Sequence, residues 1–151
     1  MEEVKTRGVI IFREDQGEYD RRLVVMTLDL GKLRLAARGV RRPKAKLASH
    51  LELFNLVELR IVGKTIIGAR VIDSFPKLRE NVESLEQAFL VSELFLEFVY
   101  PEAKDGDLFQ LLVDCFRNSD FKGFQARFIG ILGFGGAKPK NLKIFLRNRL
   151  E

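Results

Sequence analysis

Cysteine and histidine are almost missing from this chain of 151 residues, which contains one of each, Cys115 and His50. One cysteine excludes an internal disulfide and any zinc site built from several cysteines. One histidine excludes the common His-rich metal sites and argues against Ser-His-Asp chemistry. Cys115 has apolar neighbours on a predicted helix, which indicates that its side chain packs in the hydrophobic core. His50 lies where a loop is expected to enter a strand. We therefore expect no metal, no cofactor and no enzymatic activity.

Long apolar runs are also missing. A membrane-spanning helix needs about 18 or more consecutive apolar residues. The most apolar segment, residues 88–100, is interrupted by Glu93 and Glu97. The first residues, Met-Glu-Glu, lack the basic and apolar regions of a signal peptide. The sequence therefore predicts no membrane association and a cytoplasmic location.

The net charge of +5 is unevenly distributed along the chain. Residues 1–75 carry 15 Lys and Arg against 10 Asp and Glu, residues 76–121 carry 4 against 10, and residues 122–151 carry 7 against 1. Basic segments at both ends of an otherwise acidic chain favour a polyanionic partner. A solvated basic surface without a partner is the alternative reading.

Seven basic residues and no acidic residue lie between positions 32 and 46. Part of this run alternates as a strand does, with Leu33, Leu35 and Ala37 on one face and Arg34 and Arg38 on the other. A basic loop follows Gly39. A cationic sheet face beside a cationic loop can follow a phosphate backbone. The candidate nucleic-acid contacts are Lys32, Arg34, Arg38, Arg41, Arg42, Lys44 and Lys46.

Five strands are predicted in the first 75 residues, with a polar loop at 13–18, a tight turn at 30–32 and a hairpin turn at 63–64. The strands cover residues 4–12, 22–30, 33–38, 53–62 and 65–73. The connection between the third and the fourth strand is longer than the others. This pattern favours a small five-stranded barrel of the OB type, with an SH3-like barrel as the alternative.

After Pro76 the apolar period changes from 2 to about 3.6, which predicts helices. They are expected over residues 78–99, 107–116, 121–133 and 139–150, with Asp105 or Asp107 capping the second. Ten of the 13 phenylalanines lie in this part and are assigned to a helical core. The fold class is thus α+β, with an OB-fold nucleic-acid-binding domain at 1–75 and a helical domain at 76–151.

Several short motifs together resemble the bacterial RecO recombination-mediator family. They are GEYD at 17–20, LDLGK at 28–32, ARGVRRPK at 37–44, LELF at 51–54 and SFPKLRE at 74–80, followed by shorter pieces at 93–95, 108–112 and 131–134. Each piece is weak, but the ordered set covers roughly residues 4–134.

The resemblance implies an N-terminal OB-fold, a C-terminal helical domain and a role in DNA recombination and repair. By the same resemblance, the chain would bind single- and double-stranded DNA, anneal complementary strands and assist recombinase loading. Its implied protein partners are a RecR-type mediator, the C-terminal tail of the single-strand-binding protein and, indirectly, the recombinase. The implied location is the bacterial cytoplasm, in association with the nucleoid.

Three features depart from the family's usual pattern. Ala45 stands where a serine usually follows the lysine of the basic loop, and Leu53 stands where a proline is usual. Many members also carry a four-cysteine zinc module, for which this chain lacks the cysteines. The chain is therefore expected to be a short form without zinc.

A second basic region could receive an acidic tail with an apolar end. Basic side chains beside the phenylalanine-rich helices are candidates: Lys122, Arg127, Lys138, Lys140 and Lys143. The alternative is a solvated basic tail that adds to DNA affinity. For the whole chain, the alternative function is an RNA-binding OB protein of translation or ribosome assembly, because phosphate contacts do not identify the sugar.

Overall fold

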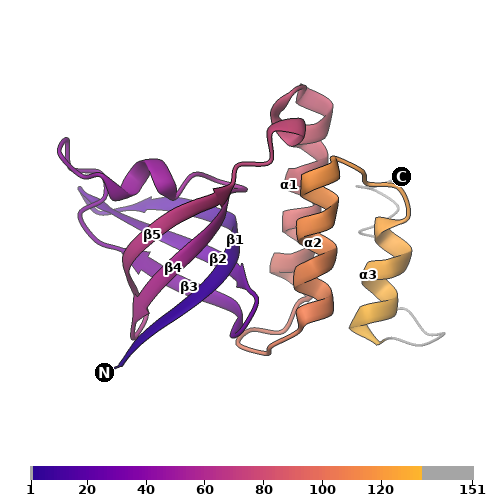
Figure 1. Cartoon of the computed structure of the whole chain (residues 1–151), viewed down its shortest axis with the longest axis horizontal. Coiled ribbons are helices and arrows are strands. Elements are labelled where there is room, and N and C mark those ends of the chain that lie inside the picture. The colour runs from indigo at the N-terminus through magenta and orange to yellow at the C-terminus, as the bar shows by residue number, and fades with distance from the viewer. Residues whose placement is uncertain (1, 134–151) are drawn as a thin grey trace.

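The computed structural model describes residues 2–133 and shows a closed five-stranded barrel followed by helices (Figure 1). Neighbouring strands follow the order β1-β2-β3-β5-β4, and β4 closes the ring by pairing with β1. The strands are β1 (Glu3–Gln16), β2 (Asp20–Thr27), β3 (Gly31–Ala37), β4 (Leu56–Val62) and β5 (Thr65–Asp73). This order, with one parallel contact between β3 and β5, is that of an OB-fold. The predicted fold class is confirmed.

Strand alternation fills the barrel. Side chains from every strand form one buried interior cluster, which includes Ile10, Leu23, Leu35, Leu59 and Ile66. The same alternation sends the intervening residues to the outer surface. A bulge in β5 opposite Arg60 leaves Ile67 out of register next to Gly68, where the sequence predicted a bulge or bend.

The predicted loop at 13–18 is wrong, because β1 continues to Gln16. Its acidic end pairs with the basic start of β2, placing Glu14 opposite Arg22 and Asp15 opposite Arg21. Arg21 also donates to the Asp15 carboxylate at 3.3 Å. Opposite charges on facing strands stabilise such pairs. The polar residues whose sequence suggests a loop therefore extend the two-stranded hairpin of β1 and β2.

Other strand boundaries also differ from the prediction. β2 covers 20–27 rather than 22–30, and the turn into β3 lies at 28–30, before Gly31. The long connection contains a short 3-10 helix, η1 (Leu47–His50), and β4 starts three residues later than expected.

The helical part begins with the 3-10 helix η2 (Pro76–Arg79), followed by α1 (Val82–Phe98), α2 (Gly106–Asn118) and α3 (Phe124–Leu132). Asn81 caps α1 by accepting from the Ser84 N–H, and Asp105 caps α2. α1 and α2 lie between the barrel and α3 (Figure 1). The fourth predicted helix, 139–150, lies outside the described residues.

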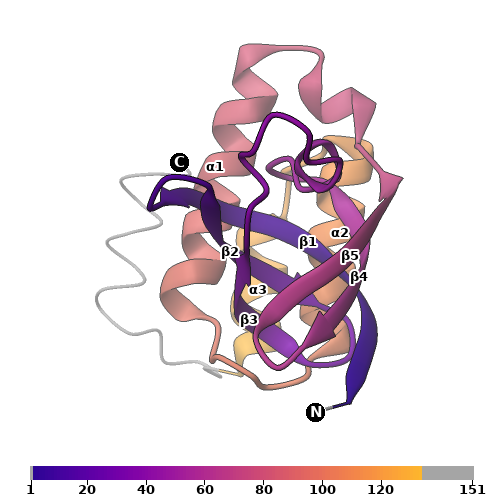
Figure 2. The same cartoon turned by 90° about the vertical axis from the view of Figure 1, so that its left-hand side faces the viewer.

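The barrel and the helices share one hydrophobic cluster. Phe54 from the barrel and Phe75 from the junction each make an edge-on contact with Phe116 of α2, at ring-centroid distances of 5.5 and 5.9 Å. Apolar residues on the outer side of β1 and β2, such as Ile11 and Met26, belong to the same cluster. Figure 2 shows the helices behind these strands. The division at 75/76 into two domains stays a prediction.

Within residues 2–133, no helix is both long enough and apolar enough to cross a lipid bilayer.

Candidate nucleic-acid interface

Two free arginines lie on the outer surface of the barrel, Arg34 on β3 and Arg38 in the turn that follows it. Leu35 and Ala37 are buried in the interior cluster, while Arg34 and Arg38 are exposed, as the alternation predicts. Neither guanidinium makes a hydrogen bond or an ion pair within the described part of the chain. A cation without a protein partner can meet a phosphate without first losing an existing contact.

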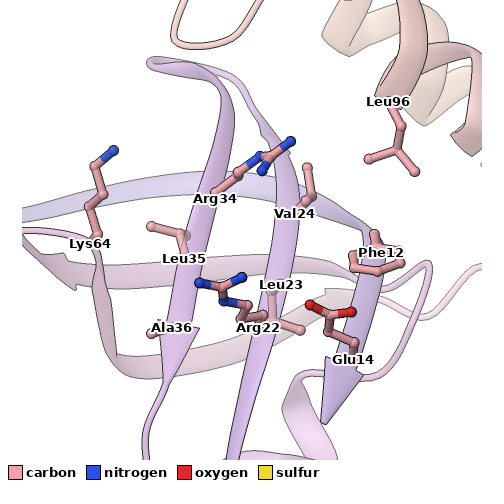
Figure 3. A pocket seen from close by; sticks show the side chains of 10 residues that line it. All are labelled: Phe12, Glu14, Arg22, Leu23, Val24, Arg34, Leu35, Ala36, Lys64 and Leu96. Atoms are coloured by element: carbon pink, nitrogen blue, oxygen red, sulfur yellow. The ribbon is translucent and has the colours of Figure 1, made fainter. Parts of the chain in front are cut away.

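Arg34 lies at the edge of a hollow of about 540 Å³ on the outer face of the first three strands (Figure 3). The hollow has Phe12 and Glu14 from β1, and Arg22 and Val24 from β2. Other lining residues are Leu23, Leu35, Ala36, Lys64 and, from α1, Leu96. Three cations therefore face this hollow against one carboxylate.

Lys32, two positions before Arg34 on β3, binds the end of α1. Its ammonium donates to the carbonyls of Phe95 at 3.1 Å and Leu96 at 2.9 Å. Burial lowers the pKa of Lys32, and so does the neighbouring Arg34, while Glu97 raises it. A cation at the last carbonyls of a helix satisfies groups that have no partner within the helix. We assign Lys32 to joining the barrel to α1 rather than to contacting DNA.

Replacing Lys32 with methionine is expected to lower the free energy of unfolding by about 1–2 kcal/mol. The substitution keeps the apolar stem and removes two charge-assisted hydrogen bonds. The Phe95 carbonyl keeps the hydrogen bond from the Val99 N–H, whereas the Leu96 carbonyl loses the donor that Lys32 supplies. Urea unfolding measures the change, with Lys44→Met as the control because Lys44 is exposed and makes no ion pair. Equal stability of the two variants would contradict the capping role.

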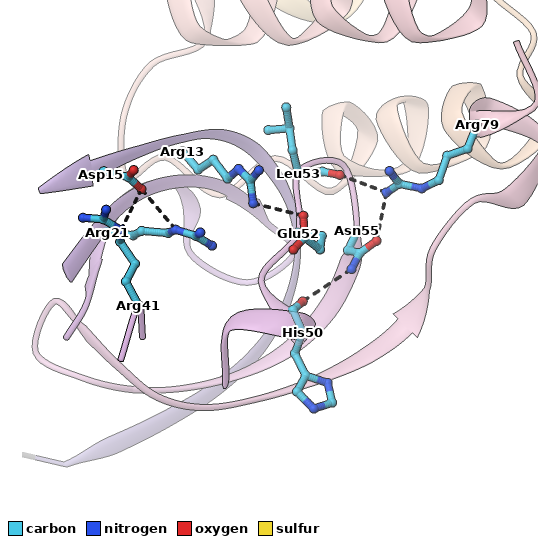
Figure 4. Close-up of polar contacts among 9 residues, drawn as sticks. All are labelled: Arg13, Asp15, Arg21, Arg41, His50, Glu52, Leu53, Asn55 and Arg79. Carbon is cyan, nitrogen blue, oxygen red and sulfur yellow. Dashed lines mark hydrogen bonds and ion pairs between the residues drawn. The ribbon is translucent and has the colours of Figure 1, made fainter. Parts of the chain in front are cut away.

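The basic loop, residues 39–46, is docked on the hairpin formed by β1 and β2. The Gly39 N–H donates to Asp20 at 2.7 Å, and Arg41 donates to the Gly17 carbonyl at 3.1 Å. Arg41 and Arg21 both pair with Asp15 (Figure 4). These contacts fix the loop beside the strands.

Arg42 stacks its guanidinium over the Tyr19 ring, 4.3 Å from the ring centroid. Lys44 and Lys46 are exposed, and their ammonium groups make no contact within the described residues. The predicted seven thus fall into two groups: Lys32, Arg41 and Arg42 have side-chain partners, whereas Arg34, Arg38, Lys44 and Lys46 have none within residues 2–133.

The structure brings together two of the five predicted tail-binding residues. Lys122 and Arg127 line one small hollow at the α2–α3 connection, together with Asp114 and Asp120. Lys122 also borders a larger hollow with Phe121 and Ile129. Lys138, Lys140 and Lys143 lie outside the described residues.

No group of three or more histidine, cysteine or acidic side chains is placed to hold a metal ion within residues 2–133. Two acidic side chains near the β1–β2 turn make structural contacts: Asp15 pairs with Arg21 and Arg41, and Asp20 accepts a hydrogen bond from the Gly39 N–H. The Nδ1 of His50 is buried without a hydrogen-bond partner.

Cys115 is buried on α2 within the shared cluster, and burial raises the pKa of its thiol to about 12. Since the thiolate is the reactive form, we expect the folded protein to resist a disulfide reagent at pH 8. One equivalent should react after addition of a denaturant. Rapid modification of the native protein would contradict the packing of α2.

The comparisons with known proteins point to one family. A family model described as "Recombination protein O N terminal" matches residues 1–75, the segment that forms the barrel. The chain is 38% identical over 120 residues to the DNA repair protein RecO of Dehalococcoides mccartyi strain 195, covering 77% of this chain and 47% of that protein.

The RecO protein of D. mccartyi strain CBDB1 is 35% identical over 146 residues, 90% of this chain and 57% of that protein. The RecO protein of Roseiflexus sp. strain RS-1 is 33% identical over 117 residues, 75% and 41% of the two chains. The chain thus spans about half the length of the curated relatives it matches. The barrel, its strand order and these matches agree, and the chain belongs to the RecO family of DNA repair proteins.

Proposed function

We propose that the chain acts in DNA repair as a non-enzymatic recombination mediator that binds single- and double-stranded DNA. The observation that carries this proposal is the pair of free arginines, Arg34 on the outer face of β3 and Arg38 in the turn after it, with Arg34 lining a cationic hollow. Supporting it, the relatives are named DNA repair proteins. The proposed phosphate contacts are Arg34, Arg38, Lys44 and Lys46, with Arg22 added from β2.

Annealing follows from the same electrostatics. Two complementary strands repel each other through their phosphates, and a surface that neutralises several phosphates lowers that repulsion. Arg34 and Lys44 lie on different parts of the barrel, on β3 and in the basic loop. Such a distributed surface can hold a strand by its backbone and leave base edges free to pair.

The experiment is strand annealing with bare single strands and with strands coated by a single-strand-binding protein. The wild-type chain should accelerate annealing of both, and Arg34→Ala with Arg38→Ala should remove most of the acceleration. Tighter binding to an RNA oligomer than to a DNA oligomer of the same sequence would contradict a DNA-directed role. It would favour the alternative of an RNA-binding OB protein.

A second part of the proposal concerns protein partners: a RecR-type mediator, through which the recombinase would be loaded, and the acidic tail of a single-strand-binding protein. For the tail, the support is that Lys122 and Arg127 line one hollow beside the apolar Phe121 region. Asp114 and Asp120 line the same hollow, so the attraction of the two basic side chains for an acidic tail must exceed the repulsion from two carboxylates. Binding of an acidic tail peptide that persists in Lys122→Glu with Arg127→Glu would reject this site.

A further inference from the structure

The hollow beside Arg34 also has an apolar surface, to which the proposed phosphate contacts assign no role. Phe12 is 37% exposed there although it is a large aromatic residue on a strand. It lies opposite Val24 in the β1–β2 register, and Val24 lies opposite Arg34 in the β2–β3 register. Figure 3 shows Leu96 reaching toward this row from α1. An aromatic ring in the same cross-strand row as Arg34, with Val24 between them, is thus open to a ligand.

The charges around this surface favour a ligand that is anionic on one side. Arg22, Arg34 and Lys64 line the hollow, and Glu14 is the one carboxylate on it. Glu14 lies opposite Arg22 across the strands, and Lys64 approaches Glu102 at 3.7 Å. Arg34 keeps no ion pair within residues 2–133. The volume of about 540 Å³ lies within the range of about 300–1,000 Å³ typical of small-ligand clefts.

We propose that the hollow holds an unpaired nucleobase of single-stranded DNA, stacked on Phe12, while Arg22 and Arg34 contact the adjoining phosphates. A nucleotide joins a flat apolar face to an anionic phosphate, which matches an open aromatic ring with guanidinium groups beside it. Duplex bases are already stacked and cannot reach the ring without being flipped out. The hollow thus distinguishes single strands from duplex. This inference rests on the DNA binding proposed above.

The test compares three DNA ligands of equal length: a thymine oligomer, an abasic oligomer with the same phosphates, and a duplex. The wild-type chain should bind the thymine oligomer at least about fivefold more tightly than the abasic one, the low end of base–aromatic stacking. Phe12→Ala should abolish that difference and leave duplex affinity within about twofold. Phe12→Tyr keeps the ring and should retain the difference.

The outcomes separate the two proposals. Equal wild-type affinity for the thymine and abasic oligomers would overturn the stacking site and leave backbone binding intact. Equal losses for all three ligands in Phe12→Ala would also overturn it, since they would indicate a purely structural role. Absence of binding to any of the three at low salt would overturn the proposed function itself.

A fluorescence reporter gives an independent readout, because the chain contains no tryptophan. Phe12→Trp places a single indole in the hollow, and stacking on a base should quench it when the thymine oligomer is added but not when the abasic oligomer is added. Val82→Trp is the control, since Val82 is 66% exposed at the start of α1 and does not line the hollow. Equal quenching at both positions would contradict the assignment.

Discussion

Phe116→Ala is expected to lower the free energy of unfolding by about 3–5 kcal/mol, the usual cost of removing a fully buried phenylalanine. The Phe116 ring is completely buried and contacts Phe54 of the barrel and Phe75 of the junction. Its removal opens a cavity where the barrel and α2 meet. Urea unfolding followed by circular dichroism measures the change.

The matched control is Phe89→Ala on α1. Phe89 also makes an edge-on contact with Phe54, at 5.0 Å, but its side chain is 51% exposed. Phe89→Ala should therefore lower the free energy of unfolding much less than Phe116→Ala does. Because the two parts share one cluster, strand and helix signals should be lost in a single transition. A barrel that stays folded after the helices have melted would contradict the shared core.

Arg34→Ala with Arg38→Ala is expected to weaken binding to single-stranded DNA by about 10- to 100-fold at low salt, whatever the sequence. Each lost charge-assisted contact to a phosphate contributes about 1 kcal/mol or more, and phosphate contacts carry no sequence information. The slope of log K against log salt should become shallower by about 1.4, since each contact contributes about 0.7 for single strands.

Arg60→Ala with Arg70→Ala is the matched control because it removes the same net charge from a different part of the barrel. Arg60 pairs with Glu3 at 3.2 Å and Arg70 with Glu58 at 3.5 Å, both on the β4 and β5 side. This variant should lose less than about threefold in affinity. Equal losses for the two double variants would show that net charge alone, and not the β3 face, attracts DNA.

Local pattern was sufficient to predict the barrel and the two free arginines. Alternation around Leu35 places Arg34 outside whatever the strand's partners are, because successive side chains on a strand point to opposite faces. The choice between OB and SH3-like barrels depends on strand order, which spacing does not determine. The observed order β1-β2-β3-β5-β4 decides it.

The role of Lys32 could not be predicted from sequence, because its partners are carbonyls 63 and 64 positions away. Arg41 likewise binds Gly17, on a hairpin that the sequence pattern presents as a loop. Long-range contacts of this kind give basic side chains protein partners that the sequence does not reveal. A run of basic residues identifies the region of a binding surface but not which of its side chains are free.

Arg22, Lys64 and Phe12 were missed because they lie outside the basic run. A signal was available for Arg22: it directly precedes Leu23, an interior residue, so strand alternation places Arg22 on the outer face. Lys64 precedes β5 and reaches the hollow only because β5 lies beside β3. Phe12 gave no local signal, since the exposure of one strand residue depends on where α1 packs.

The central claim is that exposed arginines and lysines on β2, on β3, in the turn after β3 and in the basic loop bind the DNA backbone. The salt dependence of single-strand binding tests it most directly. Affinity for a thymine oligomer should be measured from about 50 to 200 mM salt. Four or five phosphate contacts predict a log–log slope between about −2.8 and −3.5 for the wild-type chain. A slope near zero, or one unchanged in Arg34→Ala with Arg38→Ala, would contradict the account.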